Sequence, residues 1–145
     1  MNPQLNLRRI LFVEDDPDIQ TVAKMALEAL GGFTVLACSS GAEALAEVCG
    51  FAPDLVLLDV MMPGMDGPTM LTALREMPAG RFIPVVFMTA KVQTQEVCRY
   101  RALGAEEVIA KPFDPMSLSD RVRAIWSGLQ SRGPQGPALA AGVAS

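Results

Sequence analysis

Short runs of apolar residues alternate along the chain with longer segments in which apolar residues recur at helical spacing. The runs occupy residues 10–13, 35–37, 55–58, 85–88 and 108–110. Continuous apolar runs of this length are typical of strands buried on both faces, and spacings of three and four residues are typical of amphipathic helices. The alternation predicts an α/β fold in which five strands, each followed by a helix, form a parallel sheet covered on both faces.

Residues that favour helix ends agree with this division. Asp16 followed by Pro17 predicts the start of a first helix, because aspartate caps helices and proline fits their first turn. Ser40 with Glu43 resembles a capping box for a second helix, and Gly50 is expected just past its end. Further helices are predicted near residues 70–77, 93–103 and 114–129.

The length of 145 residues fits one domain. We expect a flexible start at residues 1–7, a folded domain at 8–130, and a disordered tail rich in Gly, Pro and Ala at 131–145. Half of the residues are hydrophobic, but no run approaches the roughly 18 apolar residues of a membrane span. Neither a membrane segment nor a signal peptide is therefore expected.

Charge and cysteine content narrow the class of protein further. A net charge of -4 argues against a nucleic-acid-binding surface as the main feature, so no nucleic-acid partner is expected. The three cysteines lack CxxC spacing, which indicates neither a disulfide framework nor a zinc site and favours the reducing cytoplasm. The chain has no histidine, so any phosphohistidine must belong to another protein.

Several chemically active residues follow the predicted strands. They are Glu14 and Asp15 after the first strand, Asp59 after the third, Thr89 after the fourth and Lys111 after the fifth. In an open parallel sheet, the carboxyl ends of all strands lie along one end of the sheet, and ligands bind there. Crowded carboxylates repel one another unless a cation lies among them. The sequence therefore predicts one site that combines carboxylates, a hydroxyl and an ammonium.

Mg²⁺ suits this set, because it takes one or two carboxylates and completes its shell with water and phosphate oxygens. Asp15 and Asp59 are the expected direct ligands, with Glu14 acting through water. Asp59 is then a candidate nucleophile toward a phosphoryl group, whose oxygens the metal, Lys111 and Thr89 would neutralise.

Structural interpretations of the same residues stay open. An acidic cluster at a helix start can simply complement the helix dipole. Thr89 suits a strand by propensity alone, and Lys111 could form a structural salt bridge with Asp59. The methionines of the loop after Asp59, Met61 among them, are interpreted as gap fillers in or near a mobile loop.

Four segments, in order, resemble a response-regulator receiver domain of two-component signalling: ILFVEDDPDI, DLVLLDVMMPGMDG, VVFMTAK and GAEEVIAKPF. The resemblance covers about residues 8–129 and implies a flavodoxin-like (βα)5 sheet with strand order 2-1-3-4-5. It also implies that Asp59 is the phosphoacceptor, that the Met61 carbonyl is a Mg²⁺ ligand and that the Lys111–Pro112 bond is cis.

The resemblance further implies a phosphoryl donor, either a histidine kinase or a histidine phosphotransfer protein. We expect a stand-alone switch, monomeric or weakly dimeric, that signals to an unknown protein target and is not an enzyme in the usual sense. The alternatives are a haloacid dehalogenase-type phosphohydrolase, a flavin binder and a degenerate receiver that only binds partners. One departure stands out: Val108 lies where most receivers carry a Tyr or Phe.

Overall fold

The computed structural model describes residues 6–131 and contains one sheet of five parallel strands. The strands are β1 Arg9–Val13, β2 Thr34–Cys38, β3 Leu55–Asp59, β4 Val85–Thr89 and β5 Glu107–Ala110. Their order across the sheet is β2-β1-β3-β4-β5, with β3 at the centre and β2 and β5 at the edges. The predicted flavodoxin-like fold and its strand order are confirmed.

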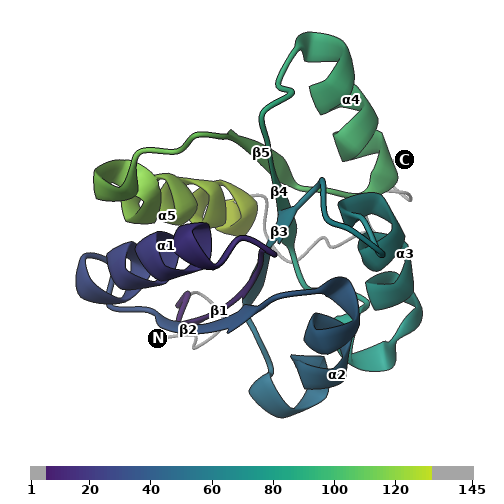
Figure 1. Cartoon of the computed structure of the whole chain (residues 1–145), viewed down its shortest axis with the longest axis horizontal. Helices are drawn as coiled ribbons and strands as arrows, with labels where there is room; N and C mark the ends of the chain where they lie inside the picture. The colour runs from purple at the N-terminus through teal and green to yellow at the C-terminus, as the bar shows by residue number, and fades with distance from the viewer. Residues whose placement is uncertain (1–5, 132–145) are drawn as a thin grey trace.

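Helices cover both faces of the sheet (Figure 1). They are α1 Pro17–Ala29, α2 Gly41–Phe51, α3 Gly67–Glu76, α4 Thr94–Leu103 and α5 Pro115–Ser131, with a short 3-10 turn, η2, at Pro78–Gly80. Figure 1 shows α1 and α5 side by side on one face, and α2, α3 and α4 on the other. Because the five strands are parallel, each connection from strand to helix emerges at the same end of the sheet, where the carboxyl ends of the strands lie.

The sheet separates two hydrophobic clusters, because successive side chains of a strand point to opposite faces. Leu11 and Leu58 face the cluster beneath α2, α3 and α4, whereas Phe12 and Leu57 face the one beneath α1 and α5. Every residue of β3 is buried, including its last residue, Asp59. Burial on both faces explains why the central strands are continuous apolar runs.

Helix starts follow the sequence signals, but one predicted end is wrong. The Asp16 carboxylate caps α1 by accepting from the backbone N–H of Asp18 at 2.9 Å. Gly50 lies inside α2, which continues to Phe51 and ends at Ala52, a non-glycine residue with φ of 52°. The extension to Phe51 positions the Phe51 ring 4.4 Å from the Arg9 guanidinium, and this cation–π contact stabilises the longer helix.

The predictions for both ends of the chain lie largely outside the described residues. Of the expected flexible start, Leu7 is described and packs against the core. Of the expected tail, residue 131 is described and closes α5. Within residues 6–131, no helix is both long and apolar enough to cross a membrane.

The cap of α3 gives a prediction for stability. The Asp66 carboxylate accepts from the Thr69 N–H at 2.9 Å, and hydrogen bonding with the Thr69 side chain and with this N–H holds the pKa of Asp66 below the ordinary 3.8. Asp66→Ala should lower the free energy of unfolding by about 1 kcal/mol near neutral pH. Since the pKa is lowered on folding, the part of this contribution that depends on the carboxylate charge is present above pH 3.8 and is lost as the pH falls through the folded value.

Urea titrations at several pH values check this expectation. Asp66→Asn is the matched control, because it retains an acceptor oxygen without a titrating charge and should show little pH dependence. If Asp66→Ala lowers the free energy of unfolding by the same amount at every pH down to acid unfolding, the cap does not depend on the carboxylate charge.

Candidate phosphoacceptor site

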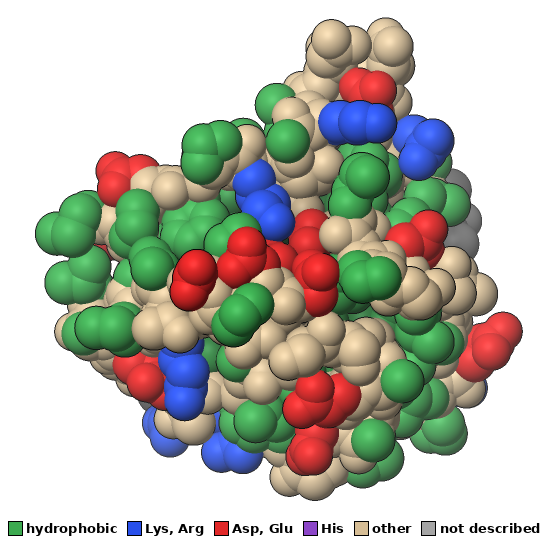
Figure 2. All heavy atoms as spheres, in the orientation of Figure 1, with side chains coloured by type: hydrophobic (Ala, Val, Ile, Leu, Met, Phe, Trp, Pro, Cys, Tyr) green, Lys and Arg blue, Asp and Glu red, His purple; other side chains and the backbone are tan. Residues whose placement is uncertain are grey.

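The strand ends bring the predicted site residues together. Glu14, Asp59 and Thr89 are 1%, 3% and 2% exposed, whereas Asp15 is exposed. Figure 2 shows acidic side chains gathered near the centre of this face, over the strand ends, with a cationic side chain beside them. Two buried carboxylates in one place require a compensating charge.

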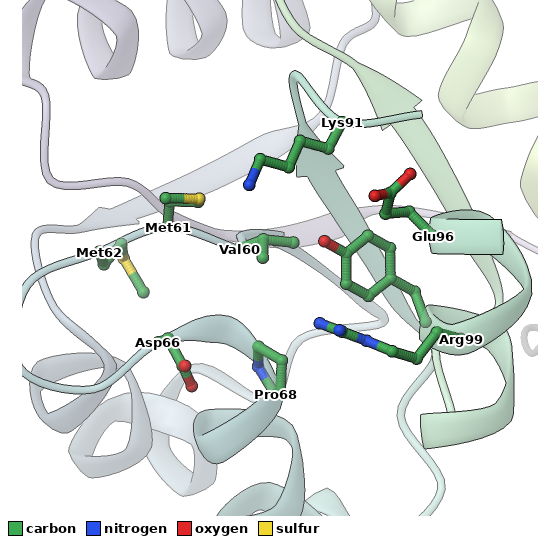
Figure 3. A pocket seen from close by; sticks show the side chains of 9 residues that line it. Val60, Met61, Met62, Asp66, Pro68, Lys91, Glu96 and Arg99 are labelled. Carbon is green, nitrogen blue, oxygen red and sulfur yellow. The ribbon is translucent and has the colours of Figure 1, made fainter. Parts of the chain in front are cut away.

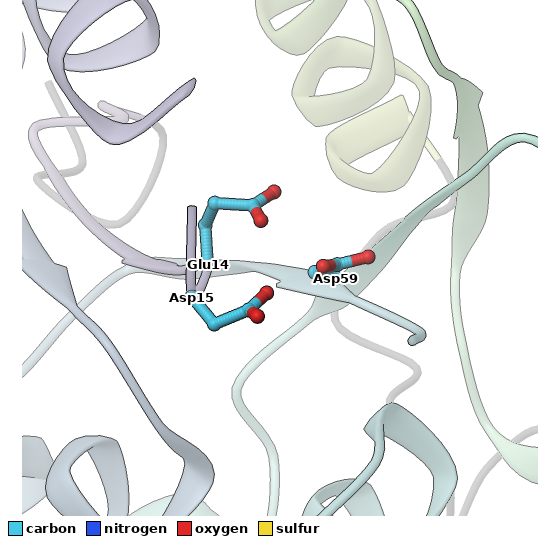
Figure 4. Close-up of side chains that lie close together, drawn as sticks. All are labelled: Glu14, Asp15 and Asp59. Atoms are coloured by element: carbon cyan, nitrogen blue, oxygen red, sulfur yellow. The ribbon is translucent and has the colours of Figure 1, made fainter. Parts of the chain in front are cut away.

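The three acidic residues form one cluster. One carboxylate oxygen from each of Glu14, Asp15 and Asp59 lies within 4.8 Å of the others. The three side chains come from two strand ends and converge on one space (Figure 4). Hard oxygen ligands at this spacing suit a divalent cation such as Mg²⁺, so the donor set fits the ion that the sequence predicted.

Lys111 supplies the charge that these carboxylates require. Its Nζ lies 2.9 Å from Glu14 Oε1 and 3.5 Å from Asp59 Oδ1. The sequence-based interpretation paired Lys111 with Asp59 alone, but the shorter contact is with Glu14. Lys111 therefore bridges the two buried carboxylates and leaves the exposed Asp15 outside the pair.

The pKa values of Glu14 and Lys111 reflect burial and charge together. Burial raises the pKa of Glu14 above 4.5, and the Asp59 charge adds to this, although hydrogen bonds from Lys111 and Asp16 oppose it. Burial alone would lower the pKa of Lys111, but its contacts with Glu14 and Asp59 outweigh burial and raise it above 10.5. Lys111 is therefore a cation at neutral pH.

Thr89 closes the site on the side of β4. Its hydroxyl accepts from the Lys91 N–H at 3.1 Å, and its carbonyl accepts from the Lys111 N–H at 2.9 Å. Within residues 6–131 it forms no hydrogen bond with Asp59. Thr89 therefore connects the loop that carries Lys91 with the strand end that carries Lys111.

The loop after β3 begins with Met61. Its N–H donates to Asp59 Oδ1 at 3.2 Å, which orients the carboxylate. Its side chain is 64% exposed, so the interpretation of Met61 as a gap filler is wrong, whereas Met62 is buried. The Lys111–Pro112 bond is cis, as the resemblance implied.

One residue at the site was missed by sequence reasoning. The Gln20 amide on α1 donates to the Glu14 carbonyl, to the Cys38 carbonyl at 3.2 Å and to the Ser39 hydroxyl at 3.1 Å. These bonds fix the backbone that carries the acidic pair. A polar residue on an amphipathic helix gives no sequence signal for such a role.

Comparison with known proteins decides the family. The model of the response regulator receiver domain matches residues 10–123, which are most of the chain and include all five strands except Arg9, the first residue of β1. The chain is a member of the response regulator receiver family. The relation of this receiver domain to individual relatives supports the same conclusion.

Sequence relatives are longer proteins. The DNA-binding response regulator MtrA of Mycolicibacterium smegmatis is 40% identical over 117 residues, which are 81% of this chain and 50% of MtrA. The transcriptional regulatory protein CseB of Streptomyces coelicolor is 36% identical over 116 residues, 80% of this chain and 48% of CseB. The chain thus spans about half the length of the curated relatives it matches.

Solved structures agree with the fold of this receiver domain. The Vibrio cholerae chemotaxis protein CheY4 superposes with a TM-score of 0.76 at 27% identity, over 83% of this chain and 99% of CheY4. A putative response regulator from Chloroflexus aurantiacus gives 0.75 at 30% identity, over 84% of this chain and 99% of its own.

Proposed function

We propose that this receiver domain is a Mg²⁺-dependent phosphoacceptor switch that takes a phosphoryl group onto Asp59 from a histidine kinase or a histidine phosphotransfer protein. The observation that carries the proposal is the position of Asp59, 3% exposed at the end of β3, 3.5 Å from Lys111 Nζ and clustered with Glu14 and Asp15. A carboxylate held beside an ammonium is suited to accept a group that brings further negative charge.

The proposed reaction is a transfer between two nucleophiles. A carboxylate oxygen of Asp59 attacks the phosphorus of a phosphohistidine, and the new P–O bond forms as the P–N bond breaks. The electron pair of that bond stays with the imidazole nitrogen, which then takes a proton. Lys111 Nζ is placed to neutralise a phosphoryl oxygen, and the Met61 N–H orients the attacking carboxylate.

Asp15 and Asp59 are the proposed direct ligands of Mg²⁺, with the Met61 carbonyl as a third and Glu14 acting through water. When bound, the ion supplies positive charge that stabilises the transferred phosphoryl group. Its presence would also relieve the repulsion among the three carboxylates.

The phosphorylated domain is proposed to signal through protein contacts in the cytoplasm. MtrA is named as a DNA-binding regulator, and this receiver domain matches half of it. The expectation that this chain binds no nucleic acid stays a prediction. A phosphohydrolase of the haloacid dehalogenase type is disfavoured, because Met61 occupies the position of its second aspartate.

Phosphoramidate, a small phosphodonor with a P–N bond, tests this function directly. Incubated with the full chain and Mg²⁺, it should form an acyl phosphate that intact mass spectrometry detects. Excess chelator should prevent its formation, because the carboxylates then lack the cation that offsets their charge. Equal labelling in chelator would rule out the Mg²⁺-dependent mechanism.

The lifetime of the acyl phosphate gives a further prediction. Met61 and Lys91 lie two residues after Asp59 and Thr89, in positions that flank the path of an attacking water in the family. The exposed Met61 side chain and the Lys91 ammonium should hinder that water. Met61→Asn with Lys91→Glu is expected to speed dephosphorylation roughly tenfold, a barrier change of about 1.4 kcal/mol. Decay is measured after removal of phosphodonor, and an unchanged half-life would contradict this role.

Val108 predicts an unusual response to phosphorylation. It is 6% exposed in β5 and packs in one cluster with Phe87 and Tyr100. A β-branched side chain has few rotamers and cannot turn inward as an aromatic ring would. Amide exchange with and without a phosphoryl mimic should therefore change more in residues 89–94 than around Val108. A dominant change in β5 would refute this expectation.

A further inference from the structure

A cavity of about 450 Å³ lies between α3 and α4, beside the loop that follows Asp59. Val60, Met61 and Pro68 form its apolar side. The β4–α4 loop and α4 form the other side with Lys91 and Arg99, which reach toward the apolar side in Figure 3. The cavity is as large as typical ligand pockets, which begin at about 300 Å³.

The two cations are available to a ligand. Lys91 and Arg99 are both exposed, and neither forms an ion pair within residues 6–131. The Arg99 guanidinium lies 5.4 Å from the centre of the Tyr100 ring, a cation–π contact that orients it in the cavity wall. An anionic group placed between them would gain two charged donors.

The acidic residues of the cavity have different roles. The Asp66 carboxylate is engaged as the cap of α3. Glu96 Oε1 is shielded from solvent and has no hydrogen-bond partner among residues 6–131. An unpaired buried acceptor is costly, so a ligand whose N–H donor meets the Glu96 carboxylate after its side chain turns into the cavity would be favoured.

We propose that this cavity is a docking site for a peptide segment of a partner protein in which an acidic residue adjoins an apolar one. The acidic side chain pairs with Lys91 and Arg99, a backbone N–H donates to Glu96, and the apolar side chain packs against Val60 and Met61. A free phosphate ion fits less well, because it supplies neither the apolar group nor a donor for Glu96. The inference is independent of the phosphorylation proposal, because its test uses the unphosphorylated chain.

A display library of random heptapeptides, selected against the full chain, tests the proposal. The enriched sequences should carry Asp or Glu next to an apolar residue, and a synthetic copy is then titrated by fluorescence polarisation. Lys91→Gln with Arg99→Gln should weaken its binding at least about tenfold, as should amidation of its acidic side chain. Lys24→Gln, which removes an exposed cation on α1, is the matched control and should have no effect.

The single tyrosine of the chain provides a readout at the site itself, because Tyr100 lines the cavity. In protein made with 3-fluorotyrosine, the peptide should move the one ¹⁹F resonance, and an unmoved resonance would place binding elsewhere. Absence of enrichment, or peptides insensitive to the Lys91 and Arg99 changes, would overturn the proposal. If inorganic phosphate competes with the peptide equally well, the cavity is an anion site only and the proposal is overturned. If the chain self-associates and the Lys91 and Arg99 changes abolish this, the occupant is a second copy of the chain and the proposal is also overturned.

Discussion

Replacing Asp59 by asparagine is expected to abolish labelling by phosphoramidate in the presence of Mg²⁺. The amide oxygen is a far weaker nucleophile than a carboxylate, and the variant keeps the size of the side chain at a site that is 3% exposed. The loss should therefore be one of chemistry, with the fold retained. Intact mass spectrometry after a fixed incubation gives the labelled fraction.

Two controls make this result specific. Asp120→Asn removes an exposed carboxylate on α5 and should label like the unmodified chain. The unfolding temperature of Asp59→Asn should be at least as high as that of the unmodified chain, because one of the clustered carboxylates has lost its charge. Full labelling of Asp59→Asn would mean that another group accepts the phosphoryl.

The second large effect concerns Mg²⁺ affinity. Within residues 6–131 the Asp15 carboxylate has no hydrogen bond or ion pair, whereas Glu14 accepts from Lys111 Nζ at 2.9 Å and from Asp16 N–H at 3.2 Å. Asp15 is thus free to bind the ion directly, and Glu14 is already engaged. Asp15→Ala should weaken Mg²⁺ binding by more than about tenfold, and Glu14→Ala by less.

Calorimetric titration of Mg²⁺ into each variant measures this order. Asp18→Ala serves as the control, since that exposed residue of the first turn of α1 lies outside the cluster. If Glu14→Ala causes the greater loss, the direct and water-mediated roles have been assigned the wrong way round.

Most of the fold was predictable because its signals are local. The central strands are buried on both faces, so a run such as residues 55–58 shows the strand directly, and Asp16 marks the start of α1 by its chemistry. The end of α2 was less predictable, since Gly50 suggested a cap and the helix continued to bring Phe51 to Arg9. That contact joins residues distant in sequence, which no local pattern contains.

The clustering of the site was predictable for the same reason: parallel strands end at one edge, so Glu14, Asp59 and Lys111 had to meet there. The sequence did not predict which carboxylate lies closer to Lys111, because this depends on the conformations of long side chains from different strands. The cavity beside α4 was also beyond prediction. Tyr100 is the one buried residue of α4, so the helix carries little apolar pattern to indicate what it faces.

The central claim is that Asp59 accepts the phosphoryl group, and reductive trapping tests it most directly. The chain is labelled with phosphoramidate and Mg²⁺, treated with borohydride to convert the acyl phosphate to a stable alcohol, digested and sequenced by mass spectrometry. Homoserine is expected at position 59 alone. Conversion at Glu14 or Asp15, or an intact Asp59 in fully labelled protein, would contradict it.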